Sequence, residues 1–370
     1  MEIKFNIPYI TGSEKDFINE SIKSRRIAGD GSFTKKCQEW FQSKFNFKKV
    51  FLTTSCTDAL EMAALLLDIK EGDEVILPAY TFVSTANAFL LRGAKLVFAE
   101  SKDNHPNINV ESIKKLITTK TKVILVMHYA GYACDMEEIM ALANAHEIFV
   151  IEDAALALGT EHHGKSLGAY GHLSAFSFHE TKNISCGEGG MLVVNDARFI
   201  KRAEIIREKG TNRSAFFRGE IDKYGWSDIG SSFLPSDILA AYLWAQLQEY
   251  DKIQSERMRI WSRYFNDLNV LKDKVGLPSN ILAHNASIFY LLCNSLEERT
   301  ELINYAKDQN IALAFHYQAL HKSNFSQSLI KLPHAEKYSD TLVRLPLYPD
   351  LTEDQQKNII SCVLKFYSTK

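Results

Sequence analysis

Short apolar runs alternate with helical patterns between residues 50 and 200, and this alternation limits the possible folds more than any other feature. The strand-like runs lie at 74–77, which ends at Pro78, and at 95–98, 122–127 and 149–151. Helical patterns separate them, as at 136–146. Strands separated by helices require right-handed crossover connections, so the pattern predicts an α/β fold with a mainly parallel sheet and flanking helices.

Three residues follow strands of this predicted sheet, at the point where each strand ends. They are Tyr80, His128 and Asp153. Ligands of parallel α/β sheets bind beyond the carboxyl ends of the strands, so these positions predict a binding site along one edge of the sheet.

Lys182 stands in a segment, 177–190, that is rich in hydroxyl side chains and glycine. Upstream, the apolar run 149–151 leads into two acids, Glu152 and Asp153. This combination suits a lysine that forms a Schiff base with pyridoxal 5′-phosphate (PLP) and a carboxylate that pairs with the cofactor's ring nitrogen. The alternative is a surface lysine beside a Gly-rich turn.

The segment 52–67 begins as a polar turn and continues as an Ala- and Leu-rich helix, with Ser55, Thr57 and Asp58 at its start. Free N–H groups at a helix N-terminus bind phosphate, and Ser or Thr hydroxyls add donors. The same residue types also form ordinary N-caps, so this segment alone leaves both interpretations open. The order of phosphate cup, aspartate and lysine along the chain favours a cofactor site.

Composition excludes several classes of protein. A chain of 370 residues can bury a large core in two lobes, and its net charge of −2 provides no basic surface for nucleic acid. No apolar run approaches the length of a membrane span, and the first residues do not resemble a signal peptide. We therefore expect a cytoplasmic protein that binds neither membrane nor nucleic acid.

The six cysteines are scattered without a Cys-x-x-Cys pair, which favours reduced thiols and argues against a zinc site. We expect no metal. Cys56 and Cys186 fall within the motifs above, where each is either a nucleophile or a small filler of a tight turn.

An amphipathic helix is expected to begin near 235–237 and to run past Leu247 toward Arg257. It would lead from a large PLP-binding domain, 1–248 with the N-terminal segment included, to a small C-terminal domain, 249–370.

These motifs together resemble the DegT/DnrJ/StrS family of PLP-dependent nucleotide-sugar aminotransferases, from about Phe5 to Tyr367. The resemblance is strongest to the WecE/RffA-type branch, which makes dTDP-4-amino-4,6-dideoxygalactose. It is carried by residues 55–57, 61–69, 80–89, 128–131, 178–183, 207–214, 228–232 and 240–247. It implies fold type I of the PLP-dependent transferases, like aspartate aminotransferase, with a smaller C-terminal α+β lobe.

The resemblance assigns a role to each residue of the cofactor site. Lys182 would bind PLP covalently and carry protons, and Asp153 would keep the ring nitrogen protonated. Phe82 would stack on the PLP ring. The residues that would bind the phosphate are Ser55, Cys56, Thr57, Asp58 and Ser177.

Two positions depart from the habits of the family. Family members are homodimers with shared active sites, and many place an asparagine of the partner on the phosphate in a Gly-x-Asn-x-Arg motif. Here Ser232 and Leu234 replace the asparagine and arginine, so the resemblance implies Ser232 of the second copy near the phosphate. Leu156 stands where the family usually has Gln or His and cannot donate a hydrogen bond to the O3′ oxygen of PLP, so we expect weaker PLP retention.

The segment 315–321 resembles a His-Tyr-x-Pro-Leu-His stretch near the family's sugar substrate. It makes His316, Tyr317 and His321 candidate substrate residues, although either histidine taken alone is better explained as a partly buried structural residue. Arg213 and Lys209 are candidates for the diphosphate, because cations and guanidinium groups suit phosphate.

Four functions remain open. The first is transfer of the amine of L-glutamate to C4 of dTDP-4-keto-6-deoxyglucose. The second is the same chemistry on a 3-keto sugar, on a UDP- or GDP-linked sugar, or with a gluco product. The third is a PLP-dependent sugar dehydratase, against which Lys182 counts because that branch carries histidine in its place. The fourth is a PLP-binding regulator without turnover.

Overall fold

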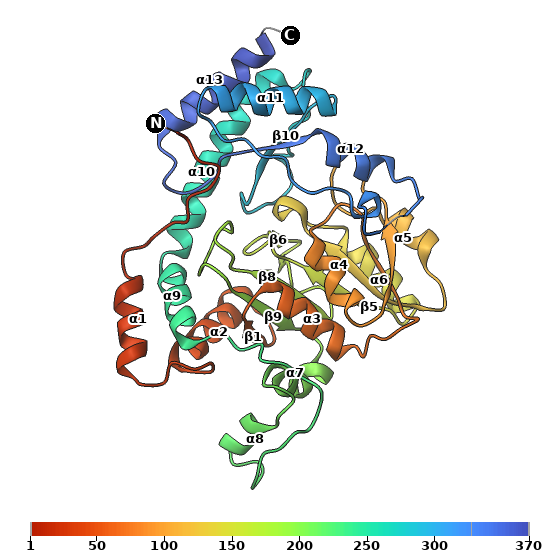
Figure 1. The fold of residues 1–370 in the computed structure, drawn as a ribbon, viewed down its shortest axis with the longest axis vertical. Helices are drawn as coiled ribbons and strands as arrows, with labels where there is room; N and C mark the ends of the chain where they lie inside the picture. Colours follow the sequence, from red (N-terminus) through yellow and green to blue (C-terminus); the bar gives the residue numbers. More distant parts are fainter. Residues whose placement is uncertain (1, 327, 369–370) are drawn as a thin grey trace.

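A seven-stranded sheet forms the centre of the larger lobe in the computed structural model, which describes residues 2–326 and 328–368 (Figure 1). In spatial order its strands are β1 (Val50–Thr53), β9 (Gly190–Val194), β8 (Leu173–Ser177), β5 (Phe149–Asp153), β4 (Thr121–Met127), β2 (Glu74–Pro78) and β3 (Lys95–Ala99). β9 pairs antiparallel with β1 and β8, and the remaining strand pairs of the sheet are parallel. The predicted mainly parallel sheet is confirmed.

Helices cover both faces of the sheet because successive strand side chains point to opposite faces. In β2, Val75 and Leu77 pack against one group of helices and Ile76 packs against another. The first group is α3 (Cys56–Leu66), α4 (Val83–Leu90) and α7 (Ile200–Arg207), and the second is α5 (Val110–Leu116) and α6 (Met136–Ala145). All three residues of β2 are therefore fully buried, as expected for a parallel sheet with two covered faces.

Three further helices pack together at the β1 end of the sheet (Figure 1): α1 (Glu14–Lys23), α2 (Ser32–Phe45) and α9 (Asp237–Gln248). The buried carboxylate of Asp237 accepts hydrogen bonds from the backbone and hydroxyl of Thr34, at 2.8 and 2.9 Å. One acid at the start of α9 thus satisfies free N–H groups at the start of α2.

The predicted long helix near residue 237 is two helices. Ser236 caps the first at the expected place, accepting from the backbone of Leu239 at 3.3 Å. That helix, α9, ends at Gln248, and α10 (Tyr250–Leu268) begins after Glu249, whose backbone (φ −103°, ψ 11°) leaves the helical region. The ring of Tyr250 packs edge-on against Trp40 and anchors the start of α10 on α2. The sequence pattern was continuous across this break, so it predicted one helix where packing produces two.

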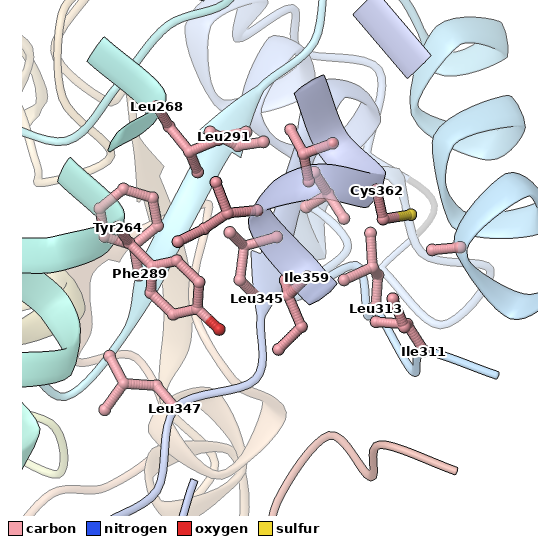
Figure 2. Packing of buried hydrophobic residues seen from close by; sticks show 14 of the residues in the cluster. Tyr264, Leu268, Phe289, Leu291, Ile311, Leu313, Leu345, Leu347, Ile359 and Cys362 are labelled. Atoms are coloured by element: carbon pink, nitrogen blue, oxygen red, sulfur yellow. The ribbon is translucent and has the colours of Figure 1, made fainter. Parts of the chain in front are cut away.

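The C-terminal lobe has its own core, shown in Figure 2. Its elements are α10, the antiparallel pair β10 (Phe289–Leu292) and β11 (Leu342–Leu345), and the helices α11 (Leu296–Asp308), α12 (Pro333–Thr341) and α13 (Glu353–Ser368). Ile3 joins this core, because its N–H donates to the carbonyl of Asn310 at 2.8 Å. The first residues therefore pack on the C-terminal lobe, whereas the domain boundary at 248/249 stays a prediction.

A segment between α7 and α9 projects away from the sheet at the bottom of Figure 1. It contains the short helix α8 (Arg213–Phe217), and its two arms pair at Glu208–Ser232 and Thr211–Trp226. Trp226 is 87% exposed and Phe217 is 68% exposed, so this projecting segment, residues 208–232, presents large apolar side chains to its surroundings.

No helix among residues 2–326 and 328–368 is both long enough and apolar enough to cross a membrane.

Candidate active site

A cavity of about 840 Å³ lies where the carboxyl ends of the parallel strands meet the C-terminal lobe. The last residues of β4, β5 and β8, which are Met127, Asp153 and Ser177, line it from the sheet. Arg344 and Leu345 of β11 line it from the other lobe. The predicted position of the site, at the carboxyl edge of the sheet, agrees with this cavity.

Lys182 reaches this cavity from the turn between β8 and β9. Its N–H donates to the carbonyl of His179 at 2.9 Å, and Cys186 N–H donates to Phe178 at 2.9 Å, which fixes the turn around the lysine. Burial lowers the pKa of Lys182, and the attraction of Asp153 opposes that shift. A lysine in such surroundings holds more of the neutral amine, the nucleophilic form, than one in water.

Asp153 faces the same cavity, whereas its neighbour Glu152 faces the opposite side of the sheet. The Asp153 carboxylate accepts from the Thr85 hydroxyl at 2.7 Å and from the Ala155 N–H at 3.1 Å. Burial raises the pKa of Asp153, and the Thr85 hydrogen bond opposes that shift. A cationic partner in the cavity would therefore stabilise the ionised carboxylate.

Glu152 is fully buried in a hydrogen-bond network of its own. Its carboxylate lies 2.9 Å from His128 Nε2 and accepts from the N–H groups of Gly168 and Gly171. His128 is thus tied to Glu152, and neither residue is among those lining the cavity. Tyr80 is buried too, among the rings of Tyr129 and Tyr317. Of the three residues predicted to follow strands, Tyr80, His128 and Asp153, only Asp153 therefore lines the cavity.

The N-terminus of α3 also borders the cavity, through Ser55, Cys56 and Thr57. The Thr57 hydroxyl donates to Ser84 at 2.8 Å. A Cβ on Gly190 would lie 2.4 Å from the backbone nitrogen of Cys56, so only glycine lets β9 approach this helix end so closely. The cup therefore offers hydroxyls and a helix N-terminus to an anion, with Ser177 on the adjacent strand.

Asp58 has a different place from the one predicted. Its N–H donates to the Ser55 hydroxyl at 3.0 Å, and its carboxylate is hydrogen-bonded to Thr54. Asp58 is not among the residues that line the cavity. Its N–H serves the N-cap of α3, so a phosphate contact from Asp58 would require that cap to open.

Neither cysteine of the motifs is suited to act as a nucleophile. Burial raises the pKa of Cys56 well above its usual range and raises that of Cys186 to about 12. Both thiols therefore stay protonated near neutral pH, as expected for small fillers of tight turns. None of the six cysteines, all of which lie in the described residues, forms a disulfide bond.

Aromatic rings form the opposite wall of the cavity. Phe82 is 55% exposed at the start of α4, and its ring lies 6.1 Å from that of Tyr317. Tyr317 stacks on His316, whose Nδ1 lies 2.8 Å from the Tyr129 hydroxyl. Burial lowers the pKa of His316 well below its usual range, and the charge of Arg344 adds to that shift, so the imidazole is neutral.

Four other predicted residues lie outside this cavity within the single chain. His321 is fully buried and its Nε2 lies 3.1 Å from Glu336, so its contacts are structural. Arg213 pairs with Glu208 at 3.1 Å in the projecting segment. Ser232 is exposed at the base of the same segment. Lys209 is exposed in this segment too, so of the five candidate substrate residues His316 and Tyr317 alone line the cavity.

Comparison with known proteins identifies the family. Residues 8–364 match the model of the DegT/DnrJ/EryC1/StrS aminotransferase family. The chain belongs to this family. The GDP-perosamine synthase of Escherichia coli O157:H7 is 33% identical over 365 residues, and the GDP-perosamine synthase of Vibrio cholerae is 29% identical over 367; both alignments cover 98% of each chain. The aminotransferase TlmJ from Streptoalloteichus hindustanus has the same fold, with a TM-score of 0.93, 24% identity and full coverage of both chains.

Membership of the DegT/DnrJ/EryC1/StrS family confirms the predicted fold class, the transaminase activity and PLP as the cofactor, because these aminotransferases are PLP-dependent. The dehydratase and the regulator without turnover lose support for the same reason. The narrower prediction of a dTDP-linked product is not confirmed, because the relatives above are GDP-perosamine synthases.

Two arginines of the cavity were missed in the sequence. Arg257 lies in the middle of α10 and Arg344 in the middle of β11, and both line the cavity. Neither stands in a motif, and each is brought to the site only by the packing of the C-terminal lobe. A weak sequence signal existed for Arg344 alone, which interrupts the apolar run 342–345, whereas Arg257 stands between Glu256 and Arg259 in a charged stretch.

Proposed function

We propose that this aminotransferase moves the amino group of L-glutamate to a keto group of a nucleotide-linked sugar, in two half-reactions that share one cavity. The observation that carries the proposal is the placement of Lys182 and Asp153 around one cavity, with the helix cup of α3 beside them. Bound PLP supplies an electron sink for the carbon that gains or loses the amine.

The residues of the chain fit the parts of that cofactor. The hydroxyls of Ser55 and Ser177 and the backbone N–H of Thr57 offer donors for the phosphate, and the N-terminus of α3 adds its dipole. Asp153 would stabilise a positive charge on the ring nitrogen. Lys182 would take a proton from one carbon and return it to another, a step that general acid–base catalysis accelerates by about 10²–10⁴.

The nucleotide of the acceptor has two candidates. The GDP-perosamine synthases, which are related over nearly the whole chain, favour a GDP-linked keto sugar. The motif resemblance of segments such as 178–183 favours dTDP-4-keto-6-deoxyglucose, aminated at C4. Turnover with glutamate and a panel of GDP-, dTDP- and UDP-linked keto sugars, with NMR of each product, decides between them. Absence of any amino-sugar product from the whole panel would contradict the proposal.

The exposed apolar side chains of the projecting segment support a homodimer. Trp226 is 87% exposed there, and Ser232 lies exposed at the base, where it is available to the phosphate of a second copy. We expect Trp226→Glu to raise the dimer dissociation constant by about thirtyfold or more, because an interface tryptophan commonly contributes about 2 kcal/mol. Sedimentation velocity measures it.

Val270→Glu is the matched control for this variant, because Val270 is 72% exposed in the C-terminal lobe. It should sediment like the unchanged protein. A fully active monomer at assay concentration would contradict the shared active sites.

Leu156 lines the cavity at the position where the family usually carries a polar side chain. Leu156→Gln is expected to tighten PLP binding a few-fold, since one hydrogen bond to the cofactor oxygen is worth about 1 kcal/mol. Fluorescence titration of PLP into cofactor-free protein measures this. Weaker binding together with a slower rate would show that the pocket has repacked around leucine, where a buried amide is unfavourable.

A further inference from the structure

Arg257 is a buried cation with no counter-charge among the residues that the structure describes. It is 2% exposed, its Nε donates to the Ala286 carbonyl at 3.2 Å, and its Nη2 donates to the Ser287 carbonyl at 2.9 Å. Its Nη1 has no protein partner among residues 2–326 and 328–368, and no carboxylate of that part of the chain lies within 4.0 Å.

A charge in such a place is unfavourable unless a ligand compensates it. Removing a charged group from water costs several kcal/mol after relaxation, and two neutral carbonyls return only part of that. Burial lowers the pKa of Arg257 to about 9, which reflects the same desolvation. Because Arg257 lines the catalytic cavity, the missing counter-charge has room to bind there.

Arg344 repeats this arrangement from β11. Its Nε and Nη2 both donate to the Phe315 carbonyl, at 3.3 and 3.0 Å, and its guanidinium lies 4.7 Å above the ring of Phe5. It has no carboxylate partner within the described residues either, and it lines the same cavity. Its charge contributes to the lowered pKa of both Lys182 and His316, which places it in the electrostatic field of the reacting lysine.

Arg257 is also tied to the lysine through the protein. Gln254, one turn earlier on α10, accepts from the Asn183 amide at 3.2 Å, and Asn183 follows Lys182 directly. Asn183 and Gln254 both donate to the carbonyl of Asn285, next to the Ala286 carbonyl that holds Arg257. The two arginines thus approach the reacting centre from two elements of the C-terminal lobe.

We propose that Arg257 and Arg344 bind the two carboxylates of the amino donor, and so select a dicarboxylic amino acid. The inference rests on the proposed function and names the residues of its donor half. One carboxylate of glutamate is bonded to the reacting carbon, which suits Arg344, because Arg344 lines the same cavity as Lys182 and its charge acts on that lysine. The second carboxylate is three bonds away from the reacting carbon, which suits the more deeply buried Arg257. A sugar diphosphate carries a bulky nucleoside, which is poorly matched to a residue that is only 2% exposed.

Measuring the two half-reactions separately distinguishes binding of the amino donor from binding of the sugar nucleotide. In the first, glutamate converts the PLP form of the enzyme to its pyridoxamine form, which absorbance reports without any sugar. We expect Arg257→Gln and Arg344→Gln each to raise the half-saturating glutamate concentration about 10- to 100-fold, because hydrogen bonds between charged groups are lost. The rate with alanine, which lacks the second carboxylate, should change less than threefold in Arg257→Gln.

A binding measurement keeps the test independent of turnover and of folding. Calorimetric titration of cofactor-free protein with glutarate should show binding to the unchanged chain and to Arg257→Lys, with a large loss in Arg257→Gln. Arg259→Gln is the matched control, because Arg259 lies on the same helix, is partly exposed and pairs with Glu256 at 2.8 Å. It should bind glutarate like the unchanged protein.

Each contrary result has a distinct meaning. The proposal would be overturned if Arg257→Gln lowered the rate with alanine as much as the rate with glutamate. It would also be overturned if Arg257→Gln and Arg344→Gln both bound glutarate like the unchanged protein. A loss confined to the keto-sugar half-reaction would overturn it too, because it would assign the arginines to the diphosphate. Normal glutamate selectivity in an enzyme that accepts no keto sugar would support the donor site and contradict the proposed function.

Discussion

Lys182→Ala is expected to lower the turnover of the aminotransferase by about 10⁴-fold or more. In the proposed function Lys182 both attaches the cofactor and moves the proton, and the loss of each of these roles costs orders of magnitude in rate. Steady-state assays with glutamate and the accepted keto sugar, at saturating PLP, measure the loss. Because the Lys182 side chain lines a cavity, its removal should leave the fold intact, which circular dichroism checks.

Lys165→Ala is the matched control, since Lys165 lies exposed in the short strand β7 (Lys165–Ser166), outside the cavity. It should retain the full rate. A Lys182→Ala enzyme within tenfold of the unchanged enzyme would mean that another group moves the proton.

Asp153→Asn is expected to lower turnover about 100-fold, or roughly 3 kcal/mol of transition-state stabilisation. Asparagine has nearly the same shape and can still accept from Thr85 or Ala155, but it carries no charge to stabilise the ring nitrogen. Pre-steady-state measurement of the glutamate half-reaction isolates the affected step. A loss below about threefold would show that a different acid faces the ring.

Glu152→Gln separates chemistry from folding at the adjacent position. Glu152 is buried in its network with His128 and two glycine N–H groups, and it does not line the cavity. Its replacement should lower the free energy of unfolding by about 1–3 kcal/mol, because buried donors lose a charged acceptor. The folded fraction should keep its rate within a few-fold.

The local part of the site was predictable from the sequence because the chemistry and the chain position coincide there. Asp153 ends a strand, Lys182 stands in the next connection, and Thr57 opens a helix, so a parallel sheet brings all three to one edge. Even the choice between Glu152 and Asp153 follows from the alternation of side chains along β5 once the position of the site is known.

The distant part of the site was not predictable, because it depends on how the C-terminal lobe packs. His316 and His321 lie five residues apart in one segment, yet His316 lines the cavity and His321 pairs with Glu336 beneath the surface. Arg257 and Arg344 carry no motif and become site residues only when α10 and β11 close over the sheet. The break at Glu249 was missed for a similar reason, since the helix after it begins at Tyr250, which packs against Trp40 of a distant segment.

The most direct test of the central assignment is to locate the covalent bond between PLP and the chain. Reduction of the holoenzyme with borohydride makes that bond permanent, and peptide mass spectrometry then identifies the modified lysine. The placement of Lys182 beside Asp153 and the α3 cup predicts a single modified peptide that contains Lys182. Modification of a different lysine, or PLP bound without any covalent attachment, would contradict the assignment of this cavity as the active site.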